Sequence, residues 1–215
     1  LERAKRKPTE NMNSYEFLLK GKELHHKFTK EDNEESLRIL DSSIEADKNN
    51  SQAYAWKACA LGQAYGRGYK ENTDELVTEI IDNINKAVEL NTNDFEAHRM
   101  LAEVHLSMHD FDKALDHGSK AFQLNPNDPR VSSVYGEILI RIKKLDEGIS
   151  LLEKAYELDP IPQGQSTSDR RICALLTGYY LSNNIKRCEE LINQIVEIDF
   201  KSWLLSIDIY NHNNK

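Results

Sequence analysis

Residues 94–128 read DFEAHRMLAEVHLSMHDFDKALDHGSKAFQLNPND, and residues 128–160 read DPRVSSVYGEILIRIKKLDEGISLLEKAYELDP. The second stretch superposes on the first at an offset of 34 residues. Small residues and prolines fall at equivalent positions: Ala102 and Gly136, Ala114 and Gly148, Ala121 and Ala155, Pro126 and Pro160. Small side chains at these intervals let two antiparallel helices cross closely, and each proline ends a helix. The spacing predicts a repeated unit of two packed helices.

The rest of the chain also has a helical pattern. No proline occurs between Thr9 and Asn125, so that stretch is free to be helical. Apolar residues recur three and four apart, as in the stretch 145–158, whereas the alternation typical of strands is hard to find. The sequence therefore predicts an all-α protein.

The period and the order of small and large residues resemble the tetratricopeptide repeat, W-x2-L-G-x2-Y…A-x3-F…P. This resemblance implies a right-handed α-solenoid with an extended concave face. The register extends both ways into more degenerate repeats, with insertions at Gly66–Thr73 and Ile161–Ser166. It divides the chain into a basic linker (1–12), five repeats (13–50, 51–94, 95–128, 129–162, 167–200), a capping helix (201–210) and a polar tail (211–215).

Composition narrows the range of partners. The chain has 28 basic and 36 acidic residues, a net charge of −8, which argues against nucleic acid. The basic stretch Arg3–Lys7 is interpreted as a solvated connector rather than a lipid or nucleic-acid patch. No apolar run is long enough to cross a membrane. The three cysteines are widely spaced, which favours a reducing compartment, and we expect a cytoplasmic protein.

A search for catalytic motifs predicts that the chain is not an enzyme and has no cofactor. Gly66-Arg-Gly68 is too short for a phosphate-binding loop and is interpreted as a hinge within the insertion. His105, His109 and His117 could approach a metal ion, since the first two are four residues apart. The register instead favours packed or solvated histidines, with His105 inside the repeat and His109 in a turn.

The repeat register also predicts where the other histidines discussed here and the cysteines lie on their helices. His25 and His26 are expected on different faces of a helix. Cys188 replaces a small packing residue, which predicts a buried and inert thiol. Cys59 and Cys173 fall on the helix face that looks into the groove.

The first helix of each repeat is the surface on which tetratricopeptide-repeat proteins usually bind ligands. By register this face carries Gln52, Cys59, Gln63, Glu96, Arg99, Glu103, Arg130, Glu137, Arg141, Arg170, Thr177 and Tyr180. Arginines recur along its second half, and a guanidinium can hold a carboxylate with two hydrogen bonds. Two interpretations stay open: an acidic or carboxylate-ended peptide binds there, or Glu96 and Arg99 pair with each other as surface ions.

The first third of the chain has a narrower resemblance. The stretches RKPTEN (6–11) and FTKEDN (28–33), with Tyr15 between them, are similar to the helical-repeat region that follows the catalytic domain in some bacterial class III adenylate and guanylate cyclases. The resemblance implies that this chain is the regulatory C-terminal part of such a signalling protein. The cyclase's paired metal-binding aspartates are not found in their motif here, so no cyclase activity is expected of this chain.

The sequence therefore predicts a non-catalytic protein–protein interaction or scaffolding module. Its partner would be a peptide, another protein, or its own N-terminal catalytic domain. The alternative is a homo-oligomerising structural element without a separate ligand, such as a homodimer formed through the apolar stretch Trp203–Tyr210.

Overall fold

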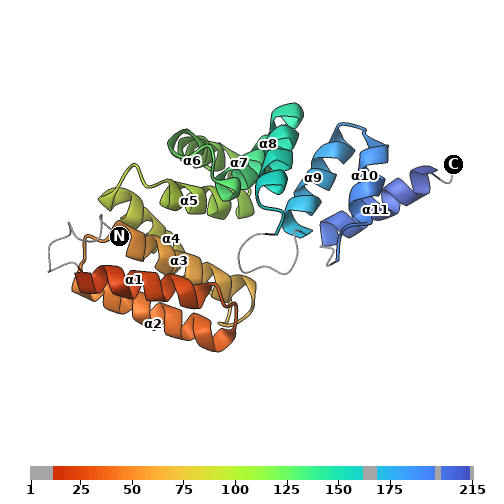
Figure 1. The fold of residues 1–215 in the computed structure, drawn as a ribbon. Helices are drawn as coiled ribbons and strands as arrows, with labels where there is room; N and C mark the ends of the chain where they lie inside the picture. Colours follow the sequence, from red (N-terminus) through yellow and green to blue (C-terminus); the bar gives the residue numbers. More distant parts are fainter. Residues whose placement is uncertain (1–11, 162–168, 197–199, 214–215) are drawn as a thin grey trace. The chain divides into compact units, whose positions relative to one another are not determined.

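A computed structural model describes residues 12–161, 169–196 and 200–213, and all regular structure in these residues is helical. Within them the all-α prediction is confirmed (Figure 1). The helices are α1 (Met12–His25), α2 (Lys30–Ala46), α3 (Ser51–Gly66), α4 (Asp74–Leu90), α5 (Phe95–Ser107), α6 (Phe111–Leu124), α7 (Pro129–Arg141), α8 (Leu145–Leu158), α9 (Asp169–Leu181), α10 (Ile185–Ile192) and α11 (Phe200–Asn213).

The chain forms two compact units, one up to Val104 and one from His105 onward. In the first unit, α1 packs against α2, α3 packs against α4, and α2 contacts α3. Leu40, Leu61 and Ile84 are fully buried in its core, and Trp56 is 2% exposed. These apolar side chains recur at helical spacing on one face of each helix, so their burial holds the hairpins together.

In the second unit, α7 packs against α6 and α8, and α9 packs against α8 and α10. The core contains Ile140, Leu152 and Leu175, with Leu176 and Cys188 beneath α11. The Arg171 guanidinium is also buried here, and it donates to the carbonyl oxygens of Ala155 and Asp159 at the end of α8. It thereby adds side-chain hydrogen bonds to carbonyl groups at the C-terminal end of that helix.

Each hairpin turns through a residue with positive φ. The turns after α1, α3, α5, α7 and α9 contain Phe28 (58°), Gly68 (67°), His109 (61°), Lys143 (66°) and Asn183 (60°). Left-handed backbone at this place ends a helix and reverses the chain. The expected position of His109 in a turn is confirmed, and the Gly66–Thr73 insertion forms the turn before Thr73 caps α4.

The small residues predicted at the helix crossings are buried. Ala102 and Ala114 are both fully buried. A Cβ built on Gly136 would lie 2.9 Å from the carbonyl oxygen of Gly148, and one built on Gly148 would lie 2.7 Å from that of Gly136. The backbones of α7 and α8 therefore touch at this crossing, as the sequence predicts.

Three of the sequence predictions concern residues outside the described ranges, wholly or in part. They are most of the basic linker 1–12, most of the loop Ile161–Ser166, and the end of the polar tail 211–215. The division into five repeats remains a prediction.

Candidate functional site

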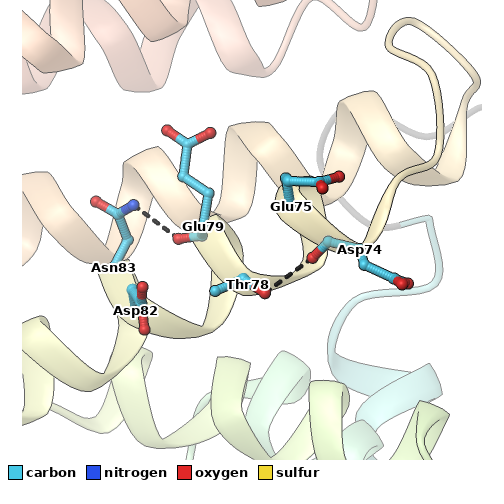
Figure 2. Close-up of a pocket in the computed structure, with 6 residues that line it drawn as sticks. All are labelled: Asp74, Glu75, Thr78, Glu79, Asp82 and Asn83. Atoms are coloured by element: carbon cyan, nitrogen blue, oxygen red, sulfur yellow. Dashed lines mark hydrogen bonds between the residues drawn. The ribbon is translucent and has the colours of Figure 1, made fainter.

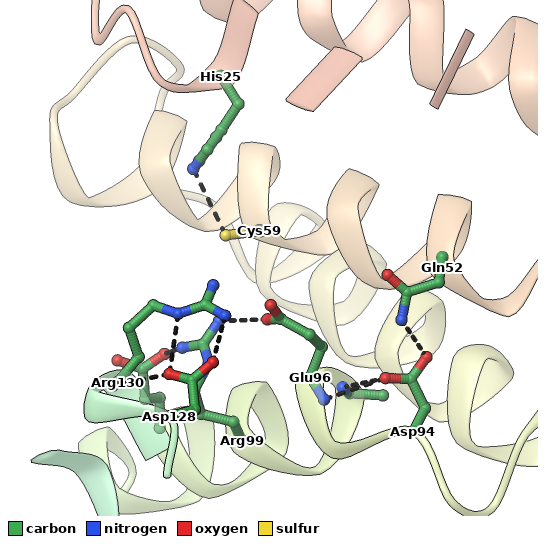
Figure 3. A network of polar contacts seen from close by, with 10 residues as sticks. His25, Gln52, Cys59, Asp94, Glu96, Arg99, Asp128 and Arg130 are labelled. Atoms are coloured by element: carbon green, nitrogen blue, oxygen red, sulfur yellow. Dashed lines mark hydrogen bonds and ion pairs between the residues drawn. The ribbon is translucent and has the colours of Figure 1, made fainter. Parts of the chain in front are cut away.

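The predicted ligand-binding residues lie on α3, α5, α7 and α9, the first helices of their hairpins. On α3, the Gln52 side-chain amide donates to Asp94 Oδ2 at 2.6 Å (Figure 3). The other Asp94 oxygen accepts from the backbone N–H groups of Glu96 and Ala97, so this carboxylate also caps the start of α5. Gln52 is therefore held in place by Asp94, the residue that caps α5.

Cys59 and Gln63 contact His25 from the C-terminal turn of α1. Cys59 Sγ lies 3.6 Å from His25 Nε2 (Figure 3), and Gln63 Nε2 donates to the His25 carbonyl at 3.1 Å. Gln63 Oε1 accepts from the buried Asn33 amide at 2.8 Å. Both first-helix side chains are half-buried and serve to connect α1, α2 and α3.

The His25 and His26 prediction is wrong in one respect. Both rings pack edge-on against Trp56, with centroids 5.5 Å away, instead of facing different directions. The reason is that α1 ends at His25, so helical geometry no longer sets the direction of His26. Burial, His26 and Arg99 lower the pKa of His25 to about 4, against a smaller effect of Glu96.

Arg99 is enclosed by two carboxylates of its own helix. It donates to Glu103 Oε2 at 2.6 Å and to Glu96 Oε2 at 3.2 Å. Burial alone would lower the pKa of the guanidinium, but Glu103 and Glu96 raise it above its ordinary value. The expected Glu96–Arg99 pair forms, but it is buried and is not a surface pair, because only 8% of the Arg99 side chain is exposed.

On α7 the arginines are more exposed than Arg99, and each is more exposed than the carboxylate it pairs with. Arg130 holds both oxygens of Asp128, with hydrogen bonds of 3.1 and 2.6 Å (Figure 3), and 39% of its side chain is exposed against 11% for Asp128. Arg141 pairs with Glu137 at 3.2 Å, with exposures of 33% and 19%. Arg130 also lowers the pKa of Asp128, although burial opposes this. In both pairs the arginine side chain is more exposed to solvent than the carboxylate.

The three α9 residues differ from one another. Arg170 is exposed. Thr177 is buried and donates to the Cys173 carbonyl at 3.0 Å, and the Tyr180 hydroxyl donates to Asp208 of α11. Cys173 is buried as well, so it does not line an open surface as the register predicts. Thr177 likewise has little surface to offer a partner.

The other predicted features were a buried Cys188 and packed histidines. Cys188 is fully buried, and burial raises the pKa of its thiol to about 11, as expected for an inert cysteine. The rings of His105 and His117 stack with centroids 5.8 Å apart, while His109 packs on Phe111. Among the described residues, no three His, Cys, Asp or Glu side chains are placed to hold a metal ion together.

A surface hollow along α4 was not predicted (Figure 2). Its lining consists of carboxylates, a hydroxyl and an amide: Asp74, Glu75, Thr78, Glu79, Asp82 and Asn83. Glu79 also pairs with Lys57 of α3 at 3.3 Å. The hollow gives this side of the first unit an acidic character.

The sequence interpretation overlooked two residues that hold the site. Asp94 positions Gln52, and Asp128 positions Arg130. They are 34 residues apart, at the same place before a first helix. An aspartate recurring with the repeat period just before a helix is a signal of a cap, and it could have identified both.

Comparisons with known proteins agree with this architecture. The profile of the family described as anaphase-promoting complex, cyclosome, subunit 3 matches residues 80–155. The search of curated proteins gave no match. Among solved structures, pilF of Pseudomonas aeruginosa is 14% identical, with a TM-score of 0.68, over 96% of this chain and 87% of that one.

Two further structures are described as tetratricopeptide-repeat proteins. One, a thermophilic protein from Thermus thermophilus, is 15% identical, with a TM-score of 0.61, over 92% of this chain and 97% of its own. The other is YrrB, "a TPR protein with an unusual peptide-binding site", which is 20% identical, with a TM-score of 0.54, over 84% of both chains. The fold is of the tetratricopeptide-repeat type. In the described part of the chain, no helix is both long and apolar enough to span a membrane.

Proposed function

We propose that this chain is a non-catalytic protein–protein interaction module that binds peptide segments on the first helices of its hairpins. The repeat fold supports this proposal, as does the peptide-binding site named for YrrB. Preformed helices lose little entropy on binding, so a few anchors can supply the affinity. The partner's chemistry is proposed from the charges on these helices.

The main support for the proposal is the solvent exposure of two arginine side chains on α7. Arg130 and Arg141 are 11 residues apart, which is close to three full helical turns, so they lie on one face. Each is more exposed than the carboxylate it pairs with. A ligand carboxylate can therefore reach either guanidinium from solvent, and α7 is proposed to anchor an acidic peptide.

The spacing of these two arginines sets the spacing of the ligand's acids. Eleven residues of helix span roughly 16 Å. An extended peptide covers that distance in about five residues. The proposed ligand carries two carboxylates about five residues apart, and the second of them could be a C-terminal carboxylate. Arg99 is excluded from this anchor because its guanidinium is buried between Glu96 and Glu103.

The test is fluorescence anisotropy with a labelled, otherwise neutral peptide that carries two aspartates five residues apart. We expect the peptide to bind the wild-type chain and its affinity to fall by about tenfold or more in the Arg130→Gln/Arg141→Gln variant. Added salt should weaken the binding, since the anchors are at the surface. The same peptide with both aspartates replaced by asparagine should bind weakly to every variant.

A charge-matched control distinguishes the loss of the two α7 arginines from the change in net charge. Arg38 and Arg187 also pair with carboxylates of their own helices and are exposed, but they lie on second helices. The Arg38→Gln/Arg187→Gln variant should bind the aspartate peptide like the wild type. Equal binding of the aspartate and asparagine peptides, or equal losses in the two double variants, would reject α7 as the anchor.

We also propose, from the resemblance of the first third of the chain alone, that the chain is the regulatory C-terminal region of a bacterial signalling protein such as a class III adenylate or guanylate cyclase. In that setting an acidic segment of the catalytic part would be the ligand of α7. The widely spaced cysteines are the support for placing this protein in the cytoplasm. Fusing the chain to such a catalytic domain and measuring cyclase activity with and without the arginine substitutions tests this parentage.

A further inference from the structure

The turn that joins α7 to α8 concentrates positive charge beside the anchor proposed on α7. Arg141 is the last residue of α7, and Lys143 and Lys144 follow it before α8 begins. Backbone hydrogen bonds of 3.0 and 2.8 Å from Lys143 and Lys144 to carbonyl groups of α7 hold the turn against the end of that helix. All three residues are exposed. This end of α7 therefore presents three cations within four residues to a ligand.

Lysine is an unusual residue at the start of α8. Helix α8 has Lys144 at its N-cap and no side-chain cap. An ammonium group only donates hydrogen bonds, and a positive charge at a helix N-terminus opposes the helix dipole. The N-caps of the other second helices supply a side-chain oxygen that accepts from a backbone N–H group: Thr29 in α2, Thr73 in α4, Asp110 in α6 and Asn184 in α10. The stability of α8 therefore does not explain Lys144.

The next hairpin shows which residue the same turn geometry favours. Lys143 and Asn183 both have left-handed backbone, with φ of 66° and 60°. The residues after them also share a conformation, with φ and ψ of −86° and 67° at Lys144 and of −92° and 72° at Asn184. Asparagine suits both positions, because it tolerates positive φ and its side chain caps a helix. The α7–α8 turn has lysine at both positions instead.

We propose that this turn binds a second acid beside the one that Arg141 anchors, a role that rests on the peptide binding proposed for α7. The ligand then carries two neighbouring carboxylates at this end. A ligand acid at Arg141 competes with Glu137, which pairs with that arginine at 3.2 Å. Within the part of the chain that the structure describes, neither Lys143 nor Lys144 makes an ion pair or a side-chain hydrogen bond. A carboxylate that reaches either ammonium therefore displaces no partner among these residues.

The expected gain in affinity is modest. Ion pairs at a protein surface are weak, because water and salt screen them. Asp146 and Glu147 also follow in the first turn of α8, where the helix dipole favours them, and their charge reduces the local positive potential. A second acid should therefore strengthen peptide binding by about threefold.

Fluorescence anisotropy with two peptides tests the proposal, each with blocked ends and an otherwise neutral sequence. One carries two aspartates five residues apart. The other has a pair of adjacent aspartates in place of each, so that either direction of binding presents a pair to the turn. The wild-type chain should bind the paired peptide about threefold more tightly, and Lys143→Asn/Lys144→Asn should lose this gain. Lys154→Gln/Lys186→Gln should keep it, since these exposed lysines lie elsewhere on second helices of the same unit.

Thermal denaturation distinguishes a binding role from a structural one. Because asparagine can cap α8, Lys143→Asn/Lys144→Asn should raise the melting temperature by about 2–4 °C while it weakens binding of the paired peptide. An unchanged or lower melting temperature would show that lysine is kept there for the fold and would overturn the proposal.

Two binding results would overturn it as well. One is a paired peptide that the wild type binds no more tightly than the single-aspartate peptide, and the other is a gain that the asparagine variant retains. In both results the single-aspartate peptide still binds through Arg130 and Arg141, so the function proposed for α7 stands. A wild-type chain that binds neither peptide would reject that function and, with it, the role of the turn.

Discussion

Gly136 and Gly148 face each other where α7 crosses α8, and neither helix has room for a methyl group at that point. A Cβ on either glycine would lie within 3 Å of the other's carbonyl oxygen. Backbone atoms cannot rotate away as the end of a side chain can. The close approach of these two helices therefore depends on the absence of both side chains.

We predict that Gly136→Ala and Gly148→Ala each lower the free energy of unfolding, by about 1–3 kcal/mol. Intrinsic helix propensity alone predicts the opposite, because it favours alanine over glycine by about 1 kcal/mol. Urea denaturation followed by circular dichroism measures the change. The crossing must separate to admit the methyl group, and apolar contacts near Leu152 are lost with it.

Gly62 provides the opposite case in the same chain. It lies inside α3, and a Cβ built there meets no atom within 4 Å. Gly62→Ala should raise the free energy of unfolding of its unit by about 0.5–1 kcal/mol. If alanine stabilised the chain at all three positions, the close crossing of α7 and α8 would be refuted.

The sequence could predict these glycines because local periodicity determines where helices cross. Ala102, Ala114, Gly136 and Gly148 recur with the repeat, and all four positions hold small residues where the pattern places a crossing. The enclosure of Arg99 could not be predicted in this way. Register assigns Arg99 to the first helix of a hairpin, and it lies in α5, but its burial depends on the side chains around it, which include Glu96 and Glu103.

The α9 residues show a second limit of register. The sequence interpretation selected Arg170, whereas its neighbour Arg171 is the buried arginine that joins α9 to Ser133 and to the end of α8. Consecutive residues point about 100° apart on a helix, so adjacent arginines have unrelated roles. Composition and spacing do not reveal which of two adjacent arginines is turned inward.

Arg99 is predicted to contribute to stability rather than to ligand binding. Replacing it with alanine leaves Glu96 and Glu103 without their shared cation, in a place where Glu96 is itself buried. Arg99→Ala should lower the free energy of unfolding by about 3–5 kcal/mol. Arg38→Ala, which breaks an exposed pair with Glu35, should change it by less than about 1 kcal/mol. Thermal or urea denaturation of both variants gives the comparison.

A triple variant distinguishes lost charge balance from lost packing. Glu96→Gln/Arg99→Met/Glu103→Gln removes all three charges and keeps side chains of similar length. It should recover most of the stability lost in Arg99→Ala, because no uncompensated charge stays buried. A triple variant as unstable as Arg99→Ala would show that the guanidinium is needed for its shape and hydrogen bonds.

The low pKa of His25 predicts a loss of stability in mild acid. The imidazole titrates at about 4 in the folded chain, compared with 6.5 when unperturbed, because burial, His26 and Arg99 disfavour its charged form and Glu96 only partly compensates. Between these two values the unfolded chain binds a proton that the folded chain does not. Stability from this group is therefore complete above pH 6.5 and declines as the pH falls towards 4.

A comparison with His25→Gln isolates this contribution from the carboxylates that titrate in the same range. Glutamine keeps a polar side chain beside Cys59 but does not titrate at any pH between about 7 and about 5. Across that range the wild type should lose about 2 kcal/mol more than the variant, measured by urea denaturation at each pH. His98→Gln serves as the control, since it removes another buried histidine of the same unit. Parallel pH dependence in the wild type and His25→Gln would show that His25 is not held neutral by the packing of α1, α3 and α5.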